Sequence, residues 1–172
     1  MEISTNINSD YLTTDEKERY QKHLTLKEIG TKGQLKLKKS SVLCIGAGGL
    51  GSSVLLYLAA AGIGKIGIAD NDYVEKSNLQ RQIIYETNAV GNLKIDAARE
   101  RIEKLNPNAK ILTFEQRIHS ENILAIIKEF DIICDCSDNF GTRYLINDAC
   151  LISKKPFVFA SVQGFEGQLS VF

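Results

Sequence analysis

Short apolar runs alternate with longer segments of helical pattern along the chain. The runs have the length of buried strands and cover residues 42–45, 65–69, 109–114, 131–135, 157–160 and 169–172. The helical segments cover residues 16–29, 32–38, 52–62, 92–106, 122–130 and 142–153. Because strands and helices alternate with short connections, the pattern predicts an α/β fold, namely a Rossmann-like, doubly wound, mostly parallel sheet with helices on both faces.

A glycine-rich turn follows the first apolar run. Gly46, Gly48 and Gly51 have the spacing G-x-G-x-x-G, and Gly49 lies between them. The first glycine allows a tight turn, the second allows a ligand to approach the backbone, and the third allows close packing of helix and strand. The helix N-terminus then offers free N–H groups to phosphate. The turn predicts a nucleotide site; the alternative is a strand–helix turn that binds nothing.

Polar side chains follow the carboxyl ends of the predicted strands, where open α/β sheets bind ligands. They are Asp70, Asp72, Asn78, Arg81, Gln82, Lys94, Asp138 and Asn139. Asp70 suits the ribose of a dinucleotide or of ATP equally well. Two cations with several carboxylates favour a metal-bound triphosphate, with Arg81 and Lys94 on phosphate oxygens and Asp138 on Mg²⁺. For Lys94 the alternative is a tolerated surface lysine.

Composition narrows the class of protein. Acidic and basic side chains balance at 21 each, which gives no electrostatic footprint for nucleic acid or for a membrane surface. No apolar run has membrane-spanning length, and residues 1–10 lack the apolar core of a signal peptide. The cysteines form no C-x-x-C pair, and we interpret them as buried or half-buried thiols of an intracellular chain: Cys44, Cys134, Cys136 and Cys150.

Several segments together resemble the adenylyltransferases that activate ubiquitin-like proteins. The similarity is greatest to the bacterial and plastid molybdopterin-synthase adenylyltransferases, with the thiamine-pathway adenylyltransferases as near kin. The matching segments follow the family's order and spacing from about Thr14 to Phe172. They are residues 19–23, 46–51, 70–72, 77–82, 90–94, 135–139 with Arg143, and 166–168.

The resemblance implies ATP and Mg²⁺ as cofactors and a role for each matching residue. Asp70 would hold the ribose with Asp72 nearby, and Asp138 would coordinate Mg²⁺. The triphosphate would be held by Asn78, Arg81 and Lys94, while the glycine loop of Gly46, Gly48, Gly49 and Gly51, together with Gln82 and Asn139, would lie against the nucleotide. The residues expected to act in catalysis are Arg81, Lys94, Asp138 and Lys22.

The resemblance also implies a substrate, the C-terminal glycine carboxylate of a ubiquitin-like sulfur-carrier protein. The expected product is an acyl-adenylate for molybdenum cofactor biosynthesis, or for the thiamine pathway. A carboxylate is already ionised at neutral pH, so the reaction needs no general base. The expected location is the bacterial cytoplasm or the plastid stroma, with no nucleic acid or membrane partner.

The sequence departs from the family's pattern in two places. Lys22 replaces an arginine that would reach the triphosphate of the partner subunit, which keeps the charge but loses the bidentate fork. Two features predict a homodimer. One is the N-terminal segment that carries Lys22, and the other is the apolar last strand, which would be prone to pair with another chain if its edge were exposed. The family's paired C-x-x-C zinc ligands and reactive cysteine are missing. We therefore expect a flexible stretch at 1–13 and an ATP-binding adenylation domain at 14–172, truncated before the zinc-binding half.

Two other classes remain open at this point. The chain could be a non-catalytic, nucleotide-binding remnant or subunit that keeps the fold and a dimer surface. It could also be a nicotinamide-dependent oxidoreductase, which needs a group for acid–base chemistry at the hydride-transfer site. Its two histidines, His23 and His119, do not follow predicted strand ends, which weighs against the oxidoreductase.

Overall fold

A single six-stranded sheet forms the centre of the molecule, and the computed structural model describes it within residues 10–172. The strand order is β3-β2-β1-β4-β5-β6, in which the first five strands are parallel and β6 is antiparallel to β5. The strands are β1 (Ser41–Ile45), β2 (Lys65–Ala69), β3 (Lys110–Phe114), β4 (Ile132–Asp135), β5 (Phe157–Gln163) and β6 (Glu166–Val171). This order confirms the predicted Rossmann-like, doubly wound, mostly parallel sheet.

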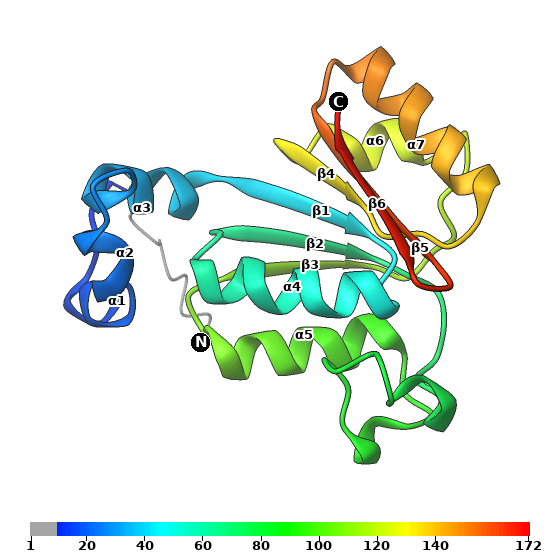
Figure 1. Cartoon of the computed structure of the whole chain (residues 1–172), viewed down its shortest axis with the longest axis horizontal. Helices are drawn as coiled ribbons and strands as arrows, with labels where there is room; N and C mark the ends of the chain where they lie inside the picture. Colours follow the sequence, from blue (N-terminus) through cyan, green and yellow to red (C-terminus); the bar gives the residue numbers. More distant parts are fainter. Residues whose placement is uncertain (1–9) are drawn as a thin grey trace, which may run out of the picture.

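Helices cover both faces of the sheet (Figure 1). One face packs against α4 (Gly49–Ala61) and α5 (Lys94–Leu105), and the other against α6 (Ile123–Ile127) and α7 (Phe140–Ser153). Strand β1 is buried on both faces, since Val42 and Cys44 belong to the first apolar cluster and Leu43 and Ile45 to the second. The continuous apolar run of β1 therefore reflects its central place in a parallel sheet.

Three short helices lie at the amino ends of the strands, at the opposite end of the sheet from the arrowheads in Figure 1. They are α1 (Thr14–Arg19), α2 (Gln21–Thr25) and α3 (Gly30–Lys39). Two 3₁₀ turns, η1 (Lys76–Asn78) and η2 (Thr87–Ala89), lie between β2 and α5. None of the helices in the described part of the chain is both long and apolar enough to cross a bilayer.

The single helix predicted for residues 16–29 is wrong. Two short helices meet at Tyr20, and Gly30 begins α3 instead of ending the preceding helix. The break buries the Tyr20 ring, whose hydroxyl accepts a 2.8 Å hydrogen bond from Asn106 Nδ2. The same ring stacks on that of His23, 6.0 Å away between centroids. Tertiary contacts with the end of α5 thus override a helical pattern that is continuous in sequence.

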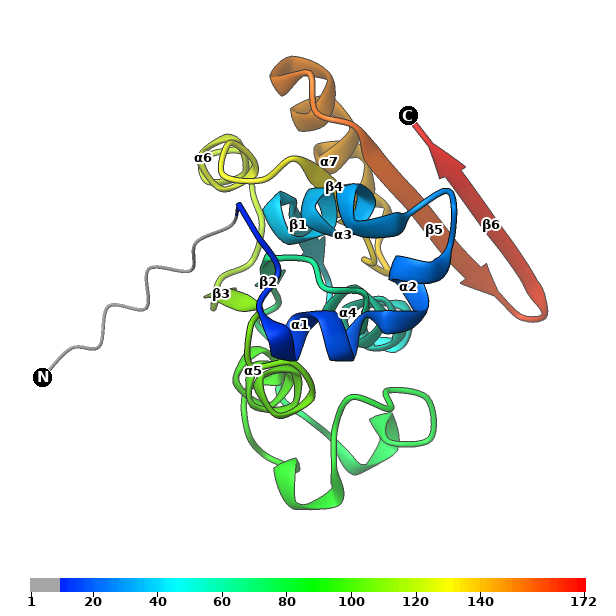
Figure 2. The same cartoon turned by 90° about the vertical axis from the view of Figure 1, so that its left-hand side faces the viewer.

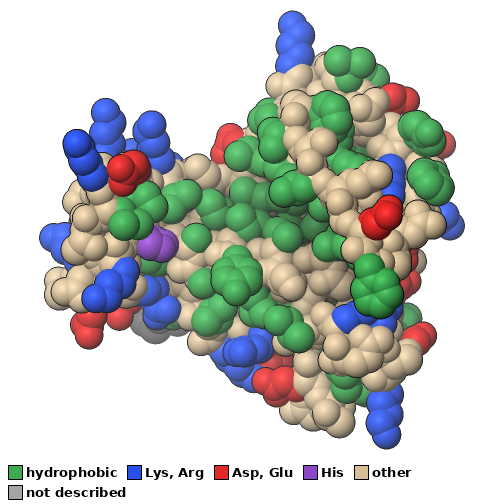
Figure 3. All heavy atoms as spheres, viewed as in Figure 1, with side chains coloured by type: hydrophobic (Ala, Val, Ile, Leu, Met, Phe, Trp, Pro, Cys, Tyr) green, Lys and Arg blue, Asp and Glu red, His purple; other side chains and the backbone are tan. Residues whose placement is uncertain are grey.

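Of the N-terminal stretch expected to be flexible, residues 1–9 lie outside the described residues, and Leu12 is buried. The last two strands form a hairpin whose turn contains Gly164, with a φ of +61°. Apolar side chains at its outer strand are exposed, namely Leu169, Val171 and the following Phe172. The hairpin extends from the body of the protein (Figure 2), and apolar side chains gather over the sheet between it and α4 (Figure 3).

Candidate functional site

A cleft of about 1040 Å³ lies at the carboxyl ends of the central strands, at the upper end of the range for small-molecule sites. Strand register explains its position: Ile45 pairs with Ala69 on one side and with Asp135 on the other. The segments that follow β1, β2 and β4 therefore meet where the strand order reverses, the usual ligand position in doubly wound folds. The predicted residues that line the cleft are Gly46, Gly48, Gly49, Asp70, Asp72, Asn78, Arg81, Gln82, Lys94, Asp138 and Asn139.

The glycine loop is held tightly against the segment after β4. Gly46 has a φ of +97°, and a methyl group on its Cα would lie only 2.6 Å from the carbonyl oxygen of Cys136. A methyl group on Gly51 would lie 2.0 Å from the Gly46 carbonyl oxygen, so Gly51 allows α4 to pack on the loop and does not line the cleft. At Gly48 the nearest atom would be Gln82 Nε2 at 3.9 Å. Of these three glycines, Gly48 leaves backbone open to a ligand.

Asp70 fixes the glycine loop from the neighbouring strand. Its carboxylate accepts hydrogen bonds from the main-chain N–H groups of Ala47, at 2.7 Å, and Asp72, at 2.9 Å. The carbonyl of Ala47 accepts a 2.8 Å hydrogen bond from the hydroxyl of Tyr85. Burial, with the charges of Asp70 and Asp72, raises the pKa of that hydroxyl, so Tyr85 remains a donor. The loop is therefore fixed at both polar groups of Ala47 before any ligand binds.

The two predicted phosphate-binding cations differ in their surroundings. Lys94 is buried in the first turn of α5, and its Nζ lies 2.8 Å from Asp72 Oδ2, so the alternative of a surface lysine is wrong. Arg81 is exposed and donates to the Ser77 carbonyl at 3.3 Å. Its side chain passes over Gly49, where a methyl group would lie 3.7 Å from its Cδ. A buried ammonium group and an exposed guanidinium group thus face the same cleft.

Two amide side chains beside Arg81 are buried. Asn78 Oδ1 accepts from the Glu75 N–H at 3.1 Å and closes the 3₁₀ turn η1. Gln82 is 3% exposed, and its Oε1 atom has no hydrogen-bond partner among residues 10–172. An unpaired buried amide oxygen is costly, and a donor group on a ligand in the cleft would satisfy it. The glycine cradle and the two cations fit a nucleotide polyphosphate, whereas this oxygen fits a donor group elsewhere on the nucleotide, such as a hydroxyl.

Asp138 and Asn139 follow β4 on the opposite wall. Asp138 is exposed to the cleft, whereas Asn139 Oδ1 accepts from the Thr142 N–H at 2.9 Å and caps α7. Within the described ranges, no three His, Cys, Asp or Glu side chains are grouped closely enough to hold a metal ion. A single carboxylate still fits Mg²⁺, because protein Mg²⁺ sites usually combine one or two carboxylates with substrate phosphates and water.

Several cleft residues were not predicted as site residues: Gln116, Arg117, Thr142, Arg143 and Val162. The first two follow β3, which lies beside β2, so only the strand order brings them to the cleft. The Arg143 guanidinium lies over the rings of Phe140 and Phe159, at 5.7 and 5.4 Å from their centroids. The sequence match around residues 135–139 included Arg143, and that was the one available signal for it.

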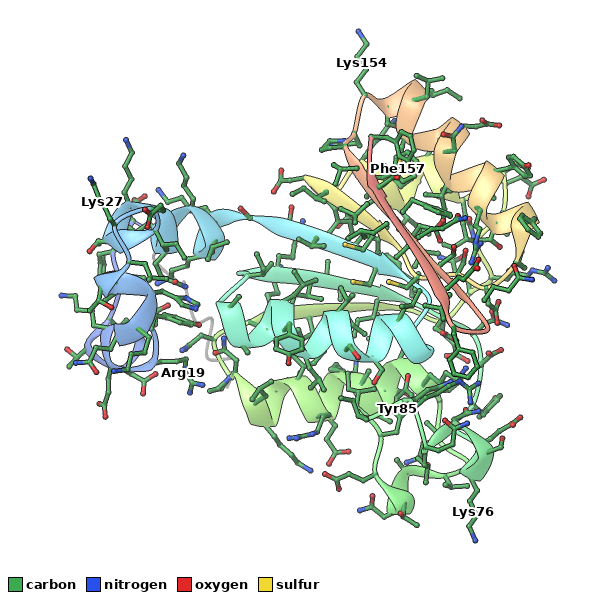
Figure 4. The ribbon with its side chains drawn as sticks, in the orientation of Figure 1. Arg19, Lys27, Lys76, Tyr85, Lys154 and Phe157 are labelled. Atoms are coloured by element: carbon green, nitrogen blue, oxygen red, sulfur yellow. The ribbon has the colours of Figure 1, made fainter. Side chains whose placement is uncertain are left out.

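Lys22 does not line the cleft of its own chain. It is exposed on α2, among the helices at the amino ends of the strands. In Figure 4 the labelled Arg19, at the end of α1, lies with the helices at the amino ends of the strands, whereas Tyr85, beside the glycine loop, lies under the carboxyl-end half of the molecule. Lys22 is therefore not among the residues of its own chain that would surround a nucleotide in this cleft.

The sequence profile of the ThiF family matches residues 20–172. The chain belongs to the ThiF family. It is 51% identical over 158 residues to a probable molybdopterin-synthase adenylyltransferase of Porphyra purpurea, a match that covers 92% of this chain and 41% of that protein. It is 46% identical over 160 residues to a sulfur carrier protein adenylyltransferase of Thermus thermophilus, which covers 93% of this chain and 59% of that one.

Solved structures of other proteins share the fold of this ThiF-family chain. One is the tRNA N6-threonylcarbamoyladenosine dehydratase TcdA of E. coli in complex with ATP, with a TM-score of 0.80, 25% identity, and coverage of 84% of this chain and 59% of that one. Another is E. coli MccB with MccA-N7isoASN, with a TM-score of 0.75, 29% identity, and coverage of 83% and 44%. The chain thus spans between about two-fifths and three-fifths of the relatives it matches.

Proposed function

We propose that this chain forms the nucleotide site of an ATP-dependent adenylyltransferase that activates the C-terminal carboxylate of a ubiquitin-like sulfur-carrier protein. The observation that carries the proposal is the convergence of the glycine loop, Arg81, Lys94 and Asp138 on one cleft. The names of the two relatives above support this reaction class, and the ATP complex of a structural neighbour supports the nucleotide.

In this proposal the nucleotide lies along the rim from β2 to β4. The half-buried carboxylate of Asp70 would accept from the ribose hydroxyls, using the lone pairs that Ala47 and Asp72 leave unused. The backbone at Gly48 and the N-terminus of α4 would receive phosphate oxygens. Asn78, Arg81 and Lys94 would surround the rest of the triphosphate, on the side of the cleft formed by the segment after β2, and Gln82 would lie against the nucleotide.

Asp138, with Asn139 beside it, would complete the site on the β4 side. Asp138 would hold Mg²⁺ together with phosphate oxygens, and the ion would supply positive charge against the phosphate oxygens. The zinc that the resemblance associates with segments not found in this sequence is not part of this proposal.

The reaction needs positioning and charge stabilisation more than proton transfer. The carrier's carboxylate is ionised at neutral pH; its oxygen forms a bond to the α-phosphorus, and the bond from that phosphorus to the pyrophosphate oxygen breaks. Negative charge grows on the leaving pyrophosphate, where Arg81 and Lys94 would stabilise it. Such prepositioned charges act without reorganising during the reaction.

The carrier and the cellular setting are further parts of the proposal. The name of the Porphyra purpurea relative favours the molybdenum cofactor pathway over the thiamine pathway. We place the protein in the bacterial cytoplasm or plastid stroma, as a homodimer in which Lys22 reaches the cleft of the partner subunit. The position of Lys22 away from its own cleft supports this arrangement.

Carrier-dependent ATP–pyrophosphate exchange tests the proposal. We expect exchange only when a sulfur-carrier protein is added, and we expect Asp138→Ala to abolish it. Asp148→Ala, which removes an exposed carboxylate from α7 outside the cleft, is the matched control and should retain exchange. ATP binding without exchange would favour the non-catalytic alternative, and binding of NAD in place of ATP would overturn the site assignment.

A further inference from the structure

The residues on either side of Asp138 are anchored. Cys136 packs against the glycine loop so closely that a methyl group on Gly46 would lie 2.6 Å from its carbonyl oxygen. Asn139 is fixed by its capping bond from the Thr142 N–H. The exposed carboxylate of Asp138 therefore lies in a turn whose neighbouring residues are fixed.

Ser137, directly before Asp138, is held at each of its polar groups. Asp135 Oδ1 accepts hydrogen bonds from both the Ser137 N–H, at 3.0 Å, and the Ser137 hydroxyl, at 2.7 Å. From the other side, Arg143 Nη2 donates to the Ser137 carbonyl oxygen at 3.0 Å. These three bonds set the direction in which the main chain enters Asp138.

Asp135 occupies its place at a cost to stability. The residue is 1% exposed at the end of β4, and its Oδ2 atom has no hydrogen-bond partner in the part of the chain that the structure describes. An unpaired oxygen of a buried carboxyl group is destabilising. Polar groups that lower stability beside a cleft are expected where function requires them.

We propose that Asp135 is a positioning residue, which acts through Ser137 to hold the Asp138 carboxylate in the orientation that receives the magnesium ion of bound ATP. The inference rests on the proposed function and adds to it a residue that lies below the cleft surface. Asp135 has no contact with the nucleotide in this arrangement. A carboxylate that is fixed in advance needs no reordering when the ion arrives, so the gain appears as tighter metal-dependent binding.

The test measures binding, not turnover. The dissociation constant of α,β-methylene ATP is determined by calorimetry, once with Mg²⁺ and once with EDTA. The constant in EDTA divided by the constant in Mg²⁺ gives the ratio by which the metal tightens binding. We expect Asp138→Ala to bring this ratio close to one. Asp135→Leu should lower it by about tenfold, because loss of an outer-shell partner typically weakens metal binding by 10–100-fold. Asp135→Asn, which keeps an acceptor oxygen for Ser137, should retain most of the ratio.

The possible outcomes separate the inference from the proposed function. A wild-type ratio in Asp135→Leu would overturn the positioning role and leave the proposed function intact. If instead the ratio of the wild type is already close to one, and Asp138→Ala does not change it, the metal site itself is overturned. If Asp135→Leu does not fold, Ser137→Ala decides: loss of one hydroxyl donor should lower the ratio by about threefold, and an unchanged ratio would overturn the inference.

Discussion

Lys94 and Asp72 are joined twice across the edge of the cleft. Lys94 Nζ lies 2.8 Å from Asp72 Oδ2, and the Lys94 N–H donates to the Asp72 carbonyl oxygen at 2.9 Å. The lysine side chain is 8% exposed and the aspartate side chain 64%. A buried ammonium in the first turn of a helix is unfavourable, and Asp72 supplies one compensating charge. A triphosphate in the cleft would supply a second.

The first prediction concerns the charge of Lys94. Lys94→Met keeps most of the side-chain volume and removes the ammonium, and we expect it to weaken ATP binding at least tenfold, because hydrogen bonds to charged groups contribute about 1.5–3 kcal/mol. Calorimetric titration with ATP measures the effect. Lys76→Met is the matched control, since Lys76 is exposed in η1 and points into solvent (Figure 4). Equal affinity in Lys94→Met and the wild type would exclude Lys94 as a phosphate ligand.

The second prediction separates backbone strain from steric clash in the glycine loop. Gly46 and Gly91 have nearly the same φ, +97° and +93°, but a methyl group on Gly91 would meet no atom within 4 Å. Gly91→Ala should therefore cost only the strain of a positive φ, about 1–2 kcal/mol. Gly46→Ala should cost a further 1–3 kcal/mol or so, because the methyl group collides with Cys136. Urea unfolding of both variants gives the difference, and equal losses would show that the loop relaxes freely.

The sequence predicted those parts of the fold that depend on local pattern. Strand β2 is an apolar run between Gly64 and Asp70, and it was predicted with its observed bounds, Lys65–Ala69. Strands β5 and β6 continue into the polar residues of their hairpin, so the apolar runs predicted at 157–160 and 169–172 did not give their observed bounds. The site residues after β1 and β2 were also predictable, because a glycine turn and an acidic strand end have local signatures. The break at Tyr20 had no such signature, since its cause is a hydrogen bond from Asn106, 86 positions away.

The rest of the site depends on the arrangement of strands. Arg117 reaches the cleft because β3 pairs with β2, which its own neighbours in sequence do not reveal. Asp135 read as the end of an apolar strand, and its link to Ser137 became visible only with the side-chain geometry. Buried residues that hold site residues in place are therefore not predictable from sequence pattern. In sequence, Asp135 looks like any other polar residue at the end of an apolar strand.

The third prediction concerns stability in acid. Glu16 Oε2 lies 2.8 Å from Lys38 Nζ and accepts from the Thr13 N–H at 2.7 Å. Burial opposes ionisation of Glu16, but Lys38 and Thr13 outweigh it and hold the pKa of this carboxyl below its usual value. Because the pKa is lower in the folded chain, the stabilisation is complete above the unfolded value, about 4.5, and is lost as the pH falls through the folded value.

Glu16→Gln tests this linkage. At pH 7 the variant should be less stable by about 3 kcal/mol, because it leaves the buried Lys38 ammonium without its counter-charge. The difference from the wild type should shrink as the pH falls below about 4.5. Urea unfolding between pH 3 and pH 7 measures it, and Glu18→Gln, at an exposed position of α1, serves as control. A difference that does not change with pH would show that packing, not charge, accounts for the effect.

The fourth prediction tests whether two chains share one site. Lys22 lies away from the cleft of its own chain, so in a homodimer each site would combine Asp138 of one chain with Lys22 of the partner subunit. Lys22→Ala and Asp138→Ala should each lose carrier-dependent exchange when tested alone. Mixed and re-equilibrated, they should regain about a quarter of wild-type activity, because half of the dimers are then mixed and each of these has one complete site.

The same experiment contains its own control. A double variant with both Lys22→Ala and Asp138→Ala, mixed with the wild type, forms dimers in which neither site is complete, since each site lacks one of the two residues. Its addition should therefore lower the exchange of a fixed amount of wild type, whereas either single variant leaves one site of each mixed dimer intact. Recovery without subunit exchange would contradict a shared site. So would the absence of recovery in mixed dimers isolated through a different affinity tag on each variant. In that case Lys22 would belong to the exposed surface of α2 alone.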